Sequence, residues 1–148
     1  MSDKSKLVYI CSPYRTGDVD ENVKRAREYC RLAVEEGFVP VAPHLLYPQF
    51  LDDLDFIQHK EGMKCGIELL SVCASVFVFD YTDESDGMRK EIAYAVENGI
   101  PIYNASLLPS GRGLFTSKID NYHAVLGALR EVLRYEKIEK SLPGHKNE

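Results

Sequence analysis

The spacing of hydrophobic residues changes several times along the chain, between runs typical of strands and repeats typical of helices. The apolar run "KLVYICS" (6–12) predicts a first strand that ends before Pro13. Apolar residues then recur at helical spacing up to Gly37, which predicts a helix with a buried stripe of Val23, Ala26, Cys30, Ala33 and Val34. The segment "FVPVAP" (38–43) predicts a second short strand, at a position where Pro40 needs no amide hydrogen.

The same alternation continues in the rest of the chain. After an irregular segment (44–56), a helical repeat is marked by Met63, Ile67, Leu70 and Cys73. The wholly apolar run "SVFVFD" (75–80) predicts a strand buried on both faces. The next helix, which ends at Asn98 and Gly99 before the strand "IPIYN" (100–104), is predicted from Met88, Ile92, Ala95 and Val96. Residues 107–117 have the composition of a loop, and a last amphipathic helix is predicted from Val125, Leu129, Val132 and Leu133.

Alternating strands and helices predict a doubly wound α/β fold, in which a parallel sheet of about four or five strands carries helices on both faces. We expect the first strand to lie in the middle of this sheet. The chain has 148 residues, 45% of them hydrophobic, which suits one domain with a core and a cleft. We place this domain at residues 1–140 and expect a frayed tail at 141–148.

Charge and composition favour a small-molecule ligand. The formal net charge is -5 and the basic residues are dispersed, so neither duplex nucleic acid nor a membrane surface is an expected partner. The early apolar run "LVYIC" is too short for a secretion signal or a membrane span, which takes about 20 residues, and we expect a cytoplasmic protein. The cysteines and histidines lack ligand spacing, which predicts reduced thiols and neither a metal nor a cofactor.

In a doubly wound fold, ligands bind beyond the carboxyl ends of the strands. The loop after the first strand, "CSPYRTGDVD" (11–20), offers Ser12, Tyr14 and Arg15 ahead of a helix whose amino end suits an anion such as phosphate. The alternative is a simple turn in which Arg15 pairs with a nearby aspartate. The loop has no glycine-rich phosphate motif that would decide between them.

The loop after "SVFVF" is rich in carboxylates and leads into a helix. Ser85 or Asp86 can cap that helix, and Gly87 lets the backbone approach a ligand. Glu91 falls about one turn inside the helix, beside the apolar stripe that contains Met88, so its carboxylate can reach the cleft. The alternative is that Glu91 only compensates the helix dipole on a solvated face.

These motifs resemble the nucleoside 2-deoxyribosyltransferase family and the related 2'-deoxynucleoside 5'-phosphate N-hydrolases. The resemblance rests on "VYICSPYR", "SVFVFD", the pattern S-x-G-x-x-x-E from Ser85 to Glu91, and "IAYAVENGIPI", and it covers roughly residues 7–104. The chain is still more similar to an uncharacterised bacterial and phage branch with "APHL" and "PQFLDD" patterns.

The resemblance implies that Glu91 is the nucleophile and that Tyr9 holds it in place, although Tyr9 could also be an ordinary core tyrosine. It further implies that Ser85 and Arg15 bind a 5'-phosphate. Such a carboxylate is needed because cleavage of an N-glycosidic bond builds positive charge on C1' of the sugar, while the leaving base needs a proton or a hydrogen bond.

The chain also departs from the family pattern. Gly66 stands where relatives have an aspartate that interacts with the base, and Glu61 and Glu68 are the nearest acids. Asp80 could take a share of that catalytic role or could cap a turn. His44 could bind ligand or could be a structural hydrogen-bonding group.

Two functions follow as expectations. The first is cleavage or transfer at the N-glycosidic bond of a (deoxy)nucleoside or nucleoside 5'-phosphate, with Glu91, Tyr9 and Asp80 as catalytic residues. The substrate would be bound by Ser12, Tyr14, Arg15, His44, Ser85, Gly87 and Met88. The second is a catalytically weak or inactive protein of the same fold that binds and captures a nucleotide. As the family resemblance implies, we also expect a homo-oligomer, formed through the last helix or the apolar loop "HLLYPQFL" (44–51).

Overall fold

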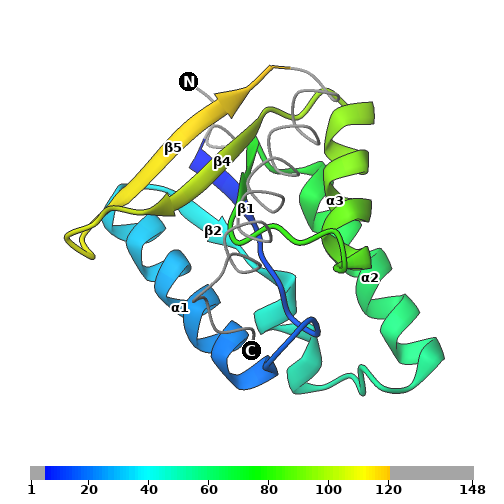
Figure 1. The fold of residues 1–148 in the computed structure, drawn as a ribbon. Helices are drawn as coiled ribbons and strands as arrows, with labels where there is room; N and C mark the ends of the chain where they lie inside the picture. Colours follow the sequence, from blue (N-terminus) through cyan, green and yellow to red (C-terminus); the bar gives the residue numbers. More distant parts are fainter. Residues whose placement is uncertain (1–5, 121–148) are drawn as a thin grey trace, which may run out of the picture.

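A five-stranded sheet in the order β2-β1-β3-β4-β5 is the centre of the computed structural model, which describes residues 6–120 (Figure 1). The strands β1 (Leu7–Cys11), β2 (Val39–Val41), β3 (Ser75–Val78) and β4 (Ile102–Leu107) pair in parallel. The last strand, β5 (Leu114–Ile119), pairs antiparallel with β4. The predicted α/β fold with a mostly parallel sheet is therefore confirmed. β1 is an inner strand, but β3 holds the middle place because β5 extends the sheet beyond β4.

Helices cover both faces of the sheet. One face packs against α1 (Val19–Glu35), and the other packs against α2 (Phe56–Ser71) and α3 (Asp86–Glu97) (Figure 1). Successive residues of β1 serve the two faces in turn, since Val8 and Ile10 pack on the α1 side while Tyr9 and Cys11 pack on the α2 and α3 side. Every second residue of β1 therefore points toward the helix layer formed by α2 and α3.

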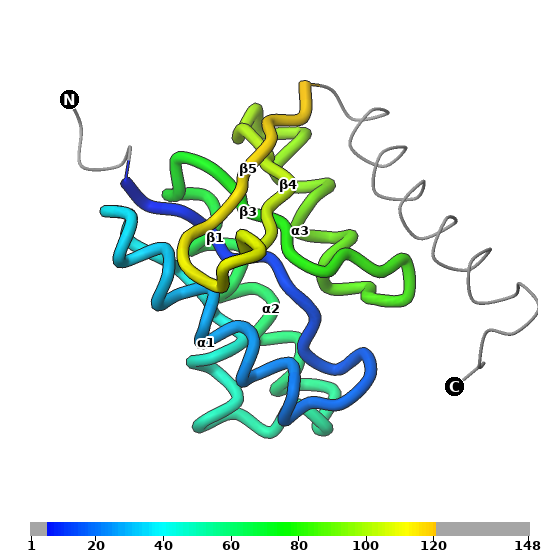
Figure 2. Tube along the Cα trace, turned by 60° about the vertical axis from the view of Figure 1, so that its left-hand side comes forward, coloured from blue at the N-terminus to red at the C-terminus, as the bar shows by residue number. Residues whose placement is uncertain are grey.

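The edge strand β2 and the segment after it follow from their prolines. Pro40 pairs with Val8 on a strand that has a neighbour on one side only, where a missing amide hydrogen is tolerated. The irregular segment that follows contains two short 3-10 helices, Pro43–Leu45 and Tyr47–Gln49. This segment and the loops after β1 and β3 meet at the carboxyl end of the sheet (Figure 2).

Helix α1 was predicted at the right place with a partly wrong buried face. Tyr29 and Leu32 are buried, whereas Val34, which the apolar repeat placed in the stripe, is 59% exposed. The reason is aromatic packing, because the ring of Tyr29 stacks on Phe79 with centroids 3.9 Å apart and so turns this side of the helix inward.

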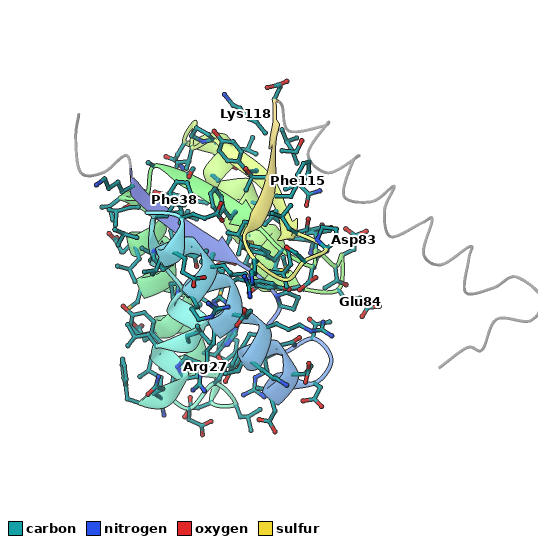
Figure 3. The ribbon with its side chains drawn as sticks, turned by 90° about the vertical axis from the view of Figure 1, so that its left-hand side faces the viewer. Arg27, Phe38, Asp83, Glu84, Phe115 and Lys118 are labelled. Atoms are coloured by element: carbon teal, nitrogen blue, oxygen red, sulfur yellow. The ribbon has the colours of Figure 1, made fainter. Side chains whose placement is uncertain are left out.

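The prediction of a loop over residues 107–117 was right for 108–113 and wrong at both ends, which are strand. β4 continues to Leu107, and β5 begins at Leu114 and also carries Phe115 and Lys118 (Figure 3). The connection turns tightly because Gly111 and Gly113 adopt positive φ angles of 75° and 92°. The carboxylate of Glu36, at the end of α1, accepts a hydrogen bond from the Leu114 amide at 2.9 Å and ties this hairpin to the helix layer.

Some expectations fall outside residues 6–120. These are the last helix, predicted from Val125, Leu129, Val132 and Leu133, and the tail 141–148. Between residues 6 and 120, no helix combines the length and the apolar character that a membrane span needs.

Candidate active site

A cavity of about 280 Å³ opens at the carboxyl end of the sheet. In the sheet, β1 has β2 as its neighbour on one side and β3 on the other. The chain order reverses here, and doubly wound folds bind ligands at such a switch point. The walls of the cavity come from the loop after β1, the segment 43–53, the first turns of α2 and the start of α3. The loop that leads into α3 includes Asp83 and Glu84 (Figure 3).

Glu91 lies on α3 with its carboxylate in this cavity, between two donors from β1. The Tyr9 hydroxyl donates a hydrogen bond to Oε2 of Glu91, and the Cys11 thiol donates to Oε1 across 3.6 Å. Burial raises the pKa of Glu91 to about 7, while the hydrogen bonds from Tyr9 and Cys11 act in the opposite direction. Burial and the nearby Glu91 raise the pKa values of Tyr9 and Cys11, so both groups keep the hydrogens that they donate.

Ser85, Gly87 and Met88 lie at the start of α3. Ser85 is the residue that caps this helix, and its side-chain oxygen accepts a hydrogen bond from the Met88 amide at 3.3 Å. Its hydroxyl hydrogen is left for another acceptor. Gly87 and the buried Met88 also line the cavity. A Cβ added at Gly87 would meet Met63 Cε at 3.9 Å, which is an ordinary contact.

The loop after β1 holds His44 beside the cavity. Ser12 Oγ lies 2.8 Å from His44 Nε2, and Tyr14 meets the imidazole edge-on with ring centroids 6.5 Å apart. Burial lowers the pKa of His44 to about 4, so the ring is neutral at physiological pH. A neutral imidazole and a hydroxyl can bind a sugar hydroxyl group without a charge.

Arg15 pairs with an aspartate that the sequence did not single out. Its Nε donates to Asp53 Oδ2 at 2.5 Å, and the other oxygen of Asp53 lies 2.7 Å from His59 Nδ1. Burial alone would raise the pKa of Asp53, but the hydrogen bonds from Arg15 and His59 hold it below the usual value. All three side chains line the cavity. A pairing of Arg15 with an aspartate was expected only nearby in the sequence, whereas Asp53 is 38 residues away.

Asp80 lies away from the site expected for it, and Gly66 leaves the position beside Tyr9 without an acid. Asp80, with φ 52°, accepts a hydrogen bond from Tyr29 on the α1 side and does not line the cavity. Gly66 is buried, and a Cβ there would lie 3.5 Å from the Tyr9 hydroxyl. Glu61 and Glu68 are exposed and absent from the cavity wall.

The structure therefore brings together eight of the ten residues that the sequence predicted for the site, as parts of one cavity wall: Ser12, Tyr14, Arg15, His44, Ser85, Gly87, Met88 and Glu91. Tyr9 does not line the cavity and contacts the site through its hydrogen bond to Glu91. The sequence missed Asp53 and His59, although "PQFLDD" already contained the first of them. Within residues 6–120, no group of three or more histidine, cysteine or carboxylate side chains could hold a metal ion.

Comparison with known proteins places the chain in a family and supports its fold. The family model described as "Domain of unknown function (DUF7768)" matches residues 6–105. Among solved structures, a 2-deoxyribosyltransferase from the psychrotolerant bacterium Bacillus psychrosaccharolyticus is 18% identical, with a TM-score of 0.50. The match covers 65% of this chain and 69% of that one, and at this identity it shows a shared fold alone. No curated protein matches the sequence.

Proposed function

We propose that this chain, which belongs to the DUF7768 family, cleaves or transfers the N-glycosidic bond of a (deoxy)nucleoside or nucleoside 5'-phosphate, with Glu91 as the nucleophile. One observation carries the proposal. The carboxylate of Glu91 faces a cavity, with each of its oxygens in contact with a donor from β1. The shared fold with a 2-deoxyribosyltransferase that serves as a biocatalyst for nucleoside synthesis supports it.

The reaction would proceed in two steps through a covalent intermediate. In the first, a Glu91 oxygen bonds to C1' of the sugar while the bond from C1' to the base nitrogen breaks, and the base leaves with the electron pair and takes up a proton. In the second, water or another base attacks C1' and releases the Glu91 carboxylate. Water gives hydrolysis, and a second base gives transfer. Tyr9 would position the carboxylate for the attack.

The cavity wall supports a nucleoside-like ligand. Tyr47, Leu51 and Met63 provide an apolar surface for a flat base. Ser12, His44 and Ser85 provide hydrogen-bonding groups that suit a sugar. If the ligand carries a 5'-phosphate, the free hydrogen of Ser85 and the amino end of α3 would bind it, together with Arg15.

A second candidate is a protein that binds the nucleotide without turnover. The observation that favours it is Gly66, because the position beside Tyr9 lacks the acid that the family resemblance implies. A Glu91 pKa of about 7 also leaves much of the carboxylate protonated at neutral pH, which weakens it as a nucleophile in the free protein.

Incubation of the purified protein with a panel of ribo- and deoxynucleosides and their 5'-monophosphates tests both candidates. Chromatography would detect released base, and a second free base in the mixture would reveal transfer. We expect the wild-type protein to release the base and the Glu91→Gln variant to release none. Lys64→Gln, an exposed change on α2 outside the cavity, is the matched control. Tight binding measured by calorimetry without any release would replace the enzyme proposal with the binding one.

A further inference from the structure

The proposed reaction needs a proton for the leaving base, and the expected acid is missing. Gly66 cannot supply a proton, and Glu61 and Glu68 are exposed away from the cavity. Among the cavity side chains, burial keeps His44 neutral with a pKa of about 4, and hydrogen bonds keep Asp53 ionised. Glu84 and Asp86 also line the cavity, but they lie at or just before the start of α3 and not in the segments that carry the apolar wall, and a hydrogen bond from Lys90 lowers the pKa of Asp86. His59 is the remaining imidazole on the cavity wall within residues 6–120.

We propose that His59 gives the leaving base its proton and that Asp53 is the positioning residue that orients the imidazole; this inference rests on the proposed function. Asp53 Oδ1 lies 2.7 Å from His59 Nδ1. An ionised carboxylate only accepts hydrogen bonds, so Nδ1 carries a hydrogen and Nε2 is the nitrogen left for a ligand. Arg15, at 2.5 Å from the other Asp53 oxygen, holds the carboxylate in place.

The position of His59 on α2 places it beside the apolar wall. His59, Gly62 and Met63 are spaced at i, i+3 and i+4, so they share one face of the helix, and all three line the cavity. Gly62 has no side chain, so this part of the cavity wall is flat. A Cβ there would lie 3.6 Å from Leu51 Cδ1 and 3.9 Å from Tyr47 Cβ. A flat base against Gly62 and Met63 would have His59 at its edge.

The proton balance closes over the two steps. As Glu91 bonds to C1' and the C1'–N bond breaks, the electron pair goes to the base, and the base takes the Nε2 proton of the imidazolium. His59 is then neutral. When water attacks C1' and the ester bond to Glu91 breaks, Nε2 takes a proton from the water. The imidazolium and the Glu91 carboxylate are both restored.

A pair of substrates tests this role directly. N7-methyl-2'-deoxyguanosine carries a positive base, which leaves as a neutral molecule without a proton, whereas 2'-deoxyguanosine needs one. The nucleosides or their 5'-monophosphates are used, whichever the natural sequence cleaves. We expect His59→Gln to lower kcat on the unmethylated substrate by about 100-fold or more and on the methylated one by less than about 3-fold. Asp53→Asn should show the same contrast at about 10-fold, and Lys64→Gln should change neither.

Other outcomes separate this inference from the proposed function. A loss that is equal on both substrates, or no loss on either, overturns the role of His59 while base release continues to support the role of Glu91. If the protein cleaves pyrimidine nucleosides only, 5-fluoro-2'-deoxyuridine replaces the methylated purine, because its base is the better leaving anion. The same contrast is then required. Cleavage of no substrate by the natural sequence overturns the proposed function and this inference with it.

Discussion

The Tyr9 hydroxyl donates a hydrogen bond to Glu91 Oε2 across 82 residues of sequence, from β1 to α3. This contact ties an inner strand of the sheet to the helix that faces the cavity. Because Cys11, two residues further along β1, reaches the other oxygen of Glu91, the strand fixes the orientation of the carboxylate. A fixed, buried carboxylate at the carboxyl end of a parallel sheet leads to the following predictions.

Glu91→Gln should abolish turnover and spare binding. The substitution keeps the shape of the side chain but removes the charge and most of the nucleophilicity, so we expect kcat to fall by several orders of magnitude. Calorimetry on the substrate should give a Kd within a few fold of the natural one. Full activity of Glu91→Gln on a substrate that the natural sequence cleaves would refute the glycosidase mechanism.

Tyr9→Phe should impair the reaction less than Glu91→Gln and also change its pH dependence. Loss of positioning should lower kcat by about 10 to 100-fold, since the nucleophile remains. The Tyr9 hydrogen bond lowers the pKa of Glu91, so its removal should raise that pKa above its present value of about 7. The acid limb of the kcat/KM profile should therefore move to higher pH. An unchanged profile would show that Tyr9 does not act through the Glu91 carboxylate.

Glu91→Gln should also stabilise the fold, in a pH-dependent way. The pKa of Glu91 is raised from its ordinary value of 4.5 to about 7, so the folded protein binds an extra proton between these values. The stability that this group contributes is complete below about pH 4.5 and is lost as the pH rises through 7. The gain from Glu91→Gln should therefore be small at pH 5 and reach up to about 3 kcal/mol at pH 8.

Urea denaturation of both proteins at several pH values measures this gain as a difference. The comparison also removes the opposite effect of His44, whose pKa is lowered to about 4. That group contributes stability above pH 6.5 that is lost as the pH falls toward 4, in both proteins alike. A gain that is the same at pH 5 and pH 8 would mean that Glu91 does not titrate with a raised pKa.

Local patterns predicted the parts of this site that lie next to regular elements. Glu91 and Ser85 follow a wholly apolar strand and begin a helix with a clear apolar repeat, so their place at the sheet edge could be inferred. The places of Asp53 and His59 could not be inferred, because the contact of Asp53 with Arg15 depends on how the irregular segment 44–55 packs against the loop after β1. Asp80 follows the same strand as Ser85, but its backbone turns to the left-handed region and its carboxylate points to Tyr29.

The apolar loop 44–51 is partly exposed, and we predict that it forms the interface of a homo-oligomer. Leu46 and Phe50 are 48% and 62% exposed, and Leu54 and Phe56 close by are more exposed still. We expect light scattering to give a mass above that of one chain, and Phe50→Asp to lower it. Lys64→Gln is again the control. A monomeric wild-type protein at micromolar concentration would contradict the expectation.

Ser85→Ala should separate the capping role of this residue from a role in phosphate binding. Loss of the cap to the Met88 amide should cost about 1 kcal/mol of stability, measured by thermal denaturation, whatever the ligand. If the hydroxyl also donates to a 5'-phosphate, the variant should bind a nucleoside 5'-monophosphate several fold more weakly while the matching nucleoside binds almost as before. Ser85→Asp is the matched control, because aspartate caps a helix as well as serine does but repels an anion. It should regain the stability and bind the monophosphate more weakly than Ser85→Ala. Equal losses for nucleoside and monophosphate in both variants would show that Ser85 acts only through the helix.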